Sequence, residues 1–125
     1  MEFENNSNYD NTSIVTEIKK LMKTIKMPLN LIGYPYVVKI LEYMVTSNRI
    51  TSLKEFYNKI SQENITTLNC VEAAVRNVIN KTLKCNSSNL RKILGISEST
   101  AVSNSIFLSA SKEVVLEKLT KNKNR

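Results

Sequence analysis

Hydrophobic residues recur at spacings of three and four along most of this chain, with polar residues between them. This periodicity is typical of amphipathic helices that bury one face. It predicts an all-α protein, a compact domain of six helices joined by short polar connections. The expected helices cover residues 13–26, 33–45, 52–63, 67–84, 89–94 and 104–119.

Local signals predict where several of these helices begin and end. Met27 precedes Pro28, and the residue before proline avoids the helical region, so the first helix should stop there. Ser52 and Glu55 have the spacing of a capping box at the start of the third helix. Thr67 is a suitable N-cap for the fourth helix, and Gly95 is a suitable stop for the fifth.

The two ends of the chain lack this periodicity. Residues 1–12 are rich in Asn, and we expect them to form a disordered polar tail. Residues 121–125 alternate Lys and Asn before a final Arg and predict a short basic tail. The segment between them, residues 13–120, has the length of one helical domain.

The composition of the chain indicates which partners it could bind and where in the cell it is located. The formal charge is +7, from 18 basic and 11 acidic side chains, which suits nucleic acid or an anionic membrane surface. The longest apolar stretch, residues 31–45, is too short to span a bilayer and is interrupted by Lys39 and Glu42. The N-terminus is no signal peptide. We therefore expect a cytoplasmic protein without membrane contact.

The residues that most enzymes need are scarce. The chain has no His, its two glycines are isolated, and Asp10 is its one Asp. A general base of the commonest kind and a phosphate-cradling loop are therefore missing. Cys70 and Cys85 match no zinc spacing. We predict a protein that is not an enzyme and needs neither a cofactor nor a metal.

The third and fourth expected helices are separated by a few residues, the arrangement of a helix-turn-helix. The outer face of the fourth helix carries side chains suited to DNA. Arg76 can form two hydrogen bonds with guanine, and Asn69 or Asn77 can do the same with adenine. The lysines can contact phosphates. Any amphipathic helix also shows polar residues to water, so the pattern alone leaves both interpretations open. The candidate DNA contacts are Thr66, Thr67, Asn69, Glu72, Ala73, Arg76, Asn77, Asn80, Lys81 and Lys84.

Short motifs in a fixed order connect the chain to a known family. They include Gly33-Tyr34-Pro35-Tyr36, Val71-Glu72-x-Ala74-Val75-Arg76, Leu94-Gly95 and Asn104-Ser105-x-Phe107. Together they make residues 13–119 resemble the C-terminal effector domain of the stage-zero master response regulator of sporulation in endospore-forming Firmicutes.

This resemblance implies a domain that binds a short G·C-containing promoter box in double-stranded DNA through its fourth helix. It also implies that the fifth helix and the loop after it contact the RNA polymerase sigma factor. The last helix, residues 104–119, would contribute to a homodimer. Glu72 and Arg76 match family residues on the DNA-contacting face.

The chain also departs from this family. Cys70 and Ala73 occupy positions where the family has Arg, and the loops at residues 47–52 and 96–103 look shorter. The phosphoacceptor receiver domain of full-length members is missing from this length. We therefore expect a sporulation-related, sequence-specific transcriptional regulator that lacks a receiver domain. The alternative is a helical interaction module that modulates the full-length regulator or RNA polymerase with little DNA binding of its own.

Overall fold

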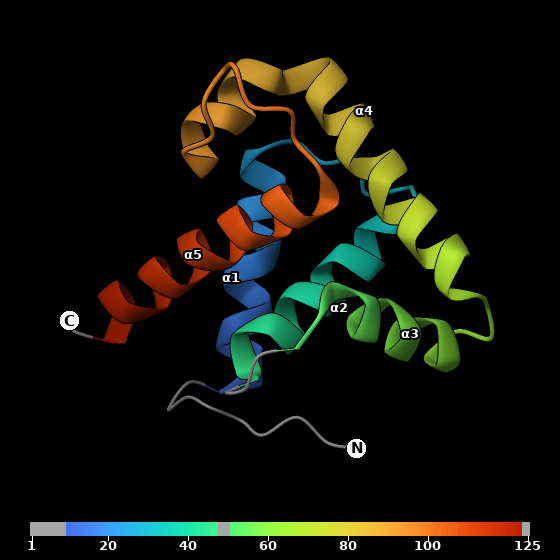
Figure 1. Cartoon of the computed structure of the whole chain (residues 1–125). Helices are drawn as coiled ribbons and strands as arrows, with labels where there is room; N and C mark the ends of the chain where they lie inside the picture. The colour runs from blue at the N-terminus through green and yellow to red at the C-terminus, as the bar shows by residue number, and fades with distance from the viewer. Residues whose placement is uncertain (1–9, 48–50, 124–125) are drawn as a thin grey trace.

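The computed structural model describes residues 10–47 and 51–123, and these residues form a helical domain (Figure 1). The expectations for residues 1–9, 48–50 and 124–125 lie outside the described part of the chain. The fold class predicted from the sequence, all-α, is confirmed. The helices are α1 (Asn11–Thr24), α2 (Gly33–Thr46), α3 (Leu53–Glu63), α4 (Leu68–Leu94) and α5 (Asn104–Lys123).

The described chain has five helices where the sequence predicted six. Helix α4 contains both the fourth and the fifth expected helices, and the connection expected between them is helical except at Asn86. There the backbone leaves helical geometry, with φ −152° and ψ 37°, and α4 bends (Figure 1). The Asn86 side-chain amide donates to the Ile25 carbonyl at 2.8 Å. This bond to α1 holds the bend, where the fourth and fifth expected helices meet without a separate connecting loop.

Helix boundaries follow the capping residues. Ser52 accepts from the Glu55 N–H and Thr67 from the Cys70 N–H, so both predicted N-caps are confirmed. Asp10 accepts from the Ser13 N–H at 2.7 Å, which starts α1 at Asn11, inside the segment expected to be disordered. Helix α5 continues to Lys123 and takes in part of the expected basic tail.

Three helices end in the same way. Lys26, Ile65 and Gly95 follow α1, α3 and α4 with positive φ values of 63°, 52° and 71°. This left-handed residue turns the next N–H back onto the last helical turn, as in a Schellman motif. The bonds run from Met27 N to Met22 O, from Thr66 N to Ser61 O and from Ile96 N to Arg91 O.

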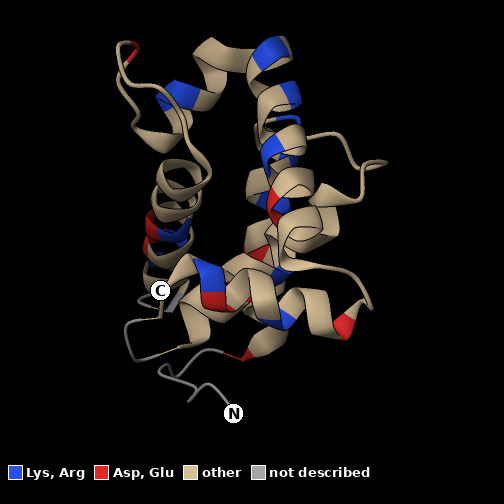
Figure 2. Ribbon diagram, turned by 45° about the vertical axis from the view of Figure 1, so that its right-hand side comes forward, with Lys and Arg blue, Asp and Glu red and all other residues tan. Residues whose placement is uncertain are grey.

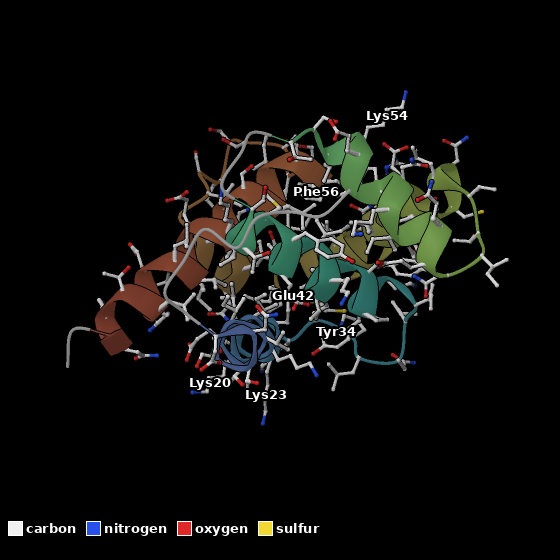
Figure 3. All side chains as sticks on the ribbon, turned by 90° about the horizontal axis from the view of Figure 1, so that it is seen from below. Lys20, Lys23, Tyr34, Glu42, Lys54 and Phe56 are labelled. Atoms are coloured by element: carbon white, nitrogen blue, oxygen red, sulfur yellow. The ribbon has the colours of Figure 1, made fainter. Side chains whose placement is uncertain are left out.

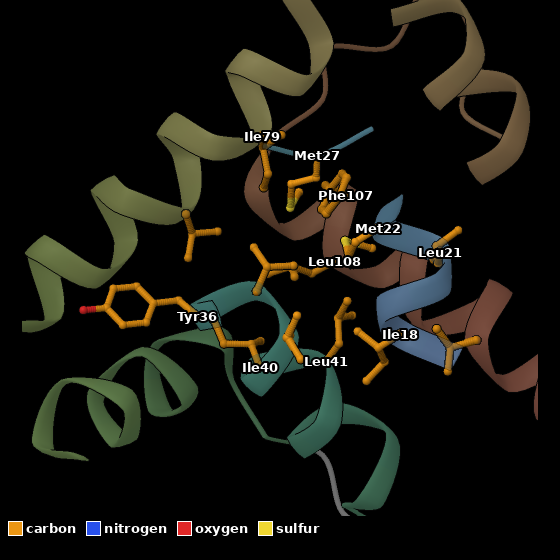
Figure 4. Close-up of a cluster of buried hydrophobic side chains, with 14 of the residues drawn as sticks. Ile18, Leu21, Met22, Met27, Tyr36, Ile40, Leu41, Ile79, Phe107 and Leu108 are labelled. Atoms are coloured by element: carbon orange, nitrogen blue, oxygen red, sulfur yellow. The ribbon is translucent and has the colours of Figure 1, made fainter. Parts of the chain in front are cut away.

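The apolar stripes meet in one core (Figure 4). Helix α2 is the most apolar of the five, and it packs against each of the other four. The helical spacing predicted that one face of each helix is buried, and the apolar stripe of α1 and the residue after it is buried throughout. Its members are Ile14, Ile18, Leu21, Met22 and Ile25.

Helices α2 and α4 cross at very short range at Gly33. A Cβ atom there would overlap the Ala74 carbonyl oxygen and lie 2.8 Å from Val78 Cγ1. Because backbone cannot move aside as a flexible side chain can, only glycine fits. This crossing sets how closely α4 lies on the body of the domain.

We predict that Gly33→Ala lowers the free energy of unfolding by about 3 kcal/mol, the upper end of overpacking costs. Alanine is the better helix former, so the loss would come from the α4 contact alone. Gly95→Ala is the matched control, because its Cβ meets nothing within 4 Å but its φ is positive. It should cost about 1 kcal/mol. Urea denaturation of both variants tests this, and an equal or smaller loss for Gly33→Ala would contradict it.

Candidate nucleic-acid interface

The outer face of α4 carries most of the residues predicted to contact DNA. Thr67 caps the helix, and Thr66 lies in the turn before it. Glu72 is half-buried, whereas the other predicted residues within α4 are exposed. The structure therefore brings the predicted set together on one helix and its entry turn. The exposed members are Asn69, Ala73, Arg76, Asn77, Asn80, Lys81 and Lys84.

Glu72 and Arg76 form an ion pair along this face, with 3.7 Å between Arg76 Nη2 and Glu72 Oε2. Both side chains are substantially exposed, at 57% for Arg76 and 41% for Glu72. An exposed pair of this spacing is weak, at most a few tenths of a kcal/mol. The guanidinium is therefore positioned by Glu72 but free to take a stronger acceptor at little cost.

The turn that leads into α4 is tightly made. Asn64 caps α3 and also donates through its side chain to the Ile60 carbonyl at 2.8 Å. Ile65 then adopts the left-handed conformation with its side chain 97% exposed. A β-branched residue in that conformation is strained. Since the Ile65 side chain is exposed, burial of apolar surface does not offset this strain. The turn thus fixes the angle between α3 and α4 at some local cost.

Cys70 and Ala73, the two positions where the resemblance implies arginines, are both exposed on the first turns of α4. Hydrogen bonds from the Thr67 hydroxyl and then from the Thr66 hydroxyl lower the pKa of the Cys70 thiol. Neither residue packs into the core, so a larger side chain at either position would have room. Cys70 and Ala73 therefore contribute to the chemistry of this face and not to its support.

A polar node beneath the outer face joins three helices. The Asn104 side-chain amide donates to the Tyr57 hydroxyl at 2.9 Å and to the Glu72 carbonyl at 3.3 Å. These bonds tie the start of α5 to α3 and α4 directly behind the Glu72–Arg76 pair. Burial raises the pKa of Tyr57, so its hydroxyl stays protonated. Asn104 was not among the residues predicted to form this site, although it belongs to the motif Asn104-Ser105-x-Phe107.

A cleft of about 340 Å³ runs beside this node. It separates the outer face of α4 from the segment that enters α5. Its walls therefore combine one edge of the candidate interface with the polar residues at the start of α5. The lining residues are Leu53, Tyr57, Glu72, Arg76, Asn80, Val102, Ser103, Asn104 and Ser105.

Helix α3 is held against α2 by a second polar cluster. The Tyr43 hydroxyl donates to both Glu63 carboxylate oxygens, at 2.9 and 2.8 Å. The Tyr43 ring stacks on Phe56, and Lys59 lies 5.3 Å from the ring centroid. Phe56 points into the domain in Figure 3, whereas Lys54 of the same helix points outward. Burial and the Glu63 hydrogen bond raise the pKa of Tyr43.

No three His, Cys, Asp or Glu side chains among the described residues are placed to hold a metal ion. Within the same residues, no helix has the length and apolar character that crossing a membrane requires.

We predict that Thr66→Ala moves the alkylation of Cys70 by iodoacetamide to higher pH. The thiolate is the reactive form, and this variant removes one hydroxyl that stabilises it while keeping the Thr67 cap. The rates are measured against pH in a Cys85→Ser background, so that one thiol reacts. An unchanged midpoint pH would show that the Thr66 hydroxyl does not act on Cys70.

Comparison with known proteins supports the resemblance on which part of this site rests. The model of the family described as sporulation initiation factor Spo0A C terminal matches residues 18–115, from α1 into α5. No curated protein and no solved structure matches the chain. The family is one of DNA-binding regulatory domains and not of enzymes. Since the match covers most of the chain, this protein belongs to the family of sporulation initiation factor Spo0A C-terminal domains.

Proposed function

We propose that this chain is a sequence-specific DNA-binding regulator of transcription in sporulation, which contacts a promoter box through the outer face of α4. The observation that carries the proposal is the exposed Glu72–Arg76 pair, seated on a frame of α2, α3 and α5 within the family match. A base-contacting helix needs such a frame, because its side chains must meet the groove in one orientation.

In this proposal α3, the turn 64–67 and the first part of α4 form a helix-turn-helix. The second helix of that motif enters the major groove with its N-terminal residues at the base edges. The first helix crosses the DNA backbone. The close α2–α4 crossing at Gly33 and the Asn104 node support this assignment, since they fix α4 from two sides.

The residue types on the outer face suggest distinct roles. Arg76 bonds guanine through two donors, and Glu72 accepts from the cytosine amino group. Asn69 and Asn77 suit adenine, and the Ala73 methyl suits the methyl group of thymine. The other polar residues contact phosphates and so fix register. In this scheme the phosphate contacts are Thr66, Thr67, Asn80, Lys81 and Lys84.

Two further contacts are proposed from the family. Residues 104–119 of α5 would contribute to a homodimer, and the segment after Asn86 with the following connection would contact the sigma factor. Arg91 supports the proposed sigma-factor contact, because its guanidinium donates to the carbonyls of Ser97 and Thr100 at 2.5 and 2.6 Å. These bonds give residues 96–100 a defined shape, which a protein contact requires. We propose that the protein acts in the cytoplasm.

A second function is favoured by one specific observation. Cys70 and Ala73 are exposed where the family has arginines, and each lost bidentate contact to guanine removes about 1–3 kcal/mol of discrimination. A domain that has lost both contacts would serve as an interaction module for the full-length regulator or for RNA polymerase.

Fluorescence anisotropy separates the two functions. The chain is titrated against promoter duplexes with a family-type box and against scrambled duplexes of the same composition, at several salt concentrations. A regulator binds the box more tightly at every salt concentration. Equal, weak binding to both duplexes would contradict the proposal and leave the interaction module.

We predict that Arg76→Ala relaxes discrimination at one G·C pair by about 1–3 kcal/mol. Lys81→Ala should instead weaken binding to all sequences about equally, because a phosphate contact carries no sequence information. Anisotropy with a set of single-base-pair variants of the box measures both effects. If Arg76→Ala altered the free energy of unfolding and left binding unchanged, Arg76 would be a structural residue.

We predict that Ala73→Arg strengthens binding to the family-type box by at least about tenfold, by restoring a guanine contact from an exposed position. Ala73→Gln, which adds length without charge, is the matched control. The same titration at fixed salt checks this. No gain from Ala73→Arg over the control would show that α4 lies on DNA in a different orientation from that of the family.

A further inference from the structure

The segment between α1 and α2 is attached to α4 at both of its ends. At one end, the Asn86 and Asn89 amides donate to the carbonyls of Ile25 and Thr24, at 2.8 and 3.4 Å. At the other end, Gly33 lies directly on Ala74 and Val78. Val78 and Asn86 are eight positions apart along α4, a rise of about 12 Å. Residues 26–32 therefore run alongside the part of α4 between Val78 and Asn86 and border its outer face.

Basic residues are frequent, and acidic residues absent, in the two segments that meet here, the end of α1 with the α1–α2 connection and the part of α4 after Glu72. Between Glu17 and Glu42 the sequence has five basic residues and no acidic one, and the same holds between Glu72 and Glu98. In Figure 2 the part of α4 beyond Glu72 accordingly carries blue segments and no red one. A genome rich in Lys codons would raise the number of lysines. It would not explain why Asp and Glu are absent from two segments that the fold brings together.

Four of these lysines form what we call the cationic ridge: Lys23 and Lys26 from the α1 side, and Lys81 and Lys84 from α4. All four are exposed, and none forms an ion pair with a described residue. Lys81 follows Ala74 by two turns, so it lies on the side of α4 that faces residues 26–32. Figure 3 shows Lys23 projecting from α1 away from the body of the domain.

The backbone at Lys26 adds to this placement. Lys26 is the left-handed residue that ends α1, and its N–H bonds to the Lys23 carbonyl at 3.0 Å. Its side chain is therefore attached to a defined turn, next to the Asn86–Ile25 bond. A lysine in that setting loses little backbone freedom on meeting an anion.

We propose that residues 23–26 are a second DNA-contacting element, in which Lys26 binds a backbone phosphate beside the segment that α4 contacts. The proposal rests on the proposed function, since it needs α4 on the duplex. Uncompensated cations on two neighbouring segments beside the outer face fit a run of backbone phosphates. The ridge contributes affinity and register without recognising sequence.

The test is the salt dependence of binding to a 30-base-pair duplex that the chain selects from a random pool. Each phosphate contact contributes about 0.9 to the slope of log K against log salt concentration. Lys26→Gln should reduce the slope by about that amount. Binding to selected and scrambled duplexes should weaken by the same factor, about three- to fourfold more at 50 mM salt than at 200 mM. Lys121→Gln, which removes an exposed charge from α5, is the matched control and should change neither value.

Trimming the duplex locates the contact. Shortening the duplex from one of its two ends should abolish the difference in salt slope between the wild type and Lys26→Gln. Shortening it from the other end should leave that difference unchanged. A slope for Lys26→Gln equal to that of Lys121→Gln would overturn the ridge, while Arg76→Ala could still show the base contact of the proposed function. The wild type could instead bind the selected and the scrambled duplex equally, with a salt slope that still depends on Lys26. That result would overturn the proposed function. Dependence on Lys26 for binding anionic phospholipid vesicles, and not for binding DNA, would assign the ridge to a membrane surface and overturn this proposal.

Discussion

The close crossing of α2 and α4 at Gly33 is the constraint on which the rest of this domain depends. Helix α2 lies at the centre of the core and is packed by every other helix, so whatever is fixed to α2 is fixed to the whole domain. Gly33 lets the backbone of α4 come against it at a distance that no other residue permits. The outer face of α4 thereby acquires a rigid support, because close-packed protein interiors deform little.

Two polar attachments complete that support, one on each side of α4. The Asn104 amide joins the start of α5 to Tyr57 and to the Glu72 carbonyl, and the Asn86 amide joins the bend of α4 to the end of α1. Each satisfies a backbone carbonyl with a side-chain donor, and each couples segments far apart in the sequence. The outer face is therefore bordered by α5 on one side and by the α1–α2 connection on the other.

The bend at Asn86 also decides what each half of α4 can do. The first half carries the Glu72–Arg76 pair and the residues proposed to contact bases. The second half turns back over the domain, where Leu90 and Leu94 are buried and Arg91 holds the following connection. A straight helix of this length would have carried that half away from the core, since 27 residues rise about 40 Å. One helix thus provides both an exposed face and part of the core.

The sequence by itself determined the fold class, the buried stripes, several capping residues and the polar composition of the outer face. These are local properties, because helical periodicity and N-caps such as Thr67 depend on residues within a turn of each other. The candidate site followed from the same local pattern together with the family motifs. The tertiary structure alone decided the fusion of two expected helices at Asn86, the need for glycine at position 33, the part played by Asn104, and the meeting of two carboxylate-free segments in the cationic ridge. Each of these depends on partners more than 30 residues away, and the spacing of residues along a chain does not specify which distant backbone atom a side chain will reach.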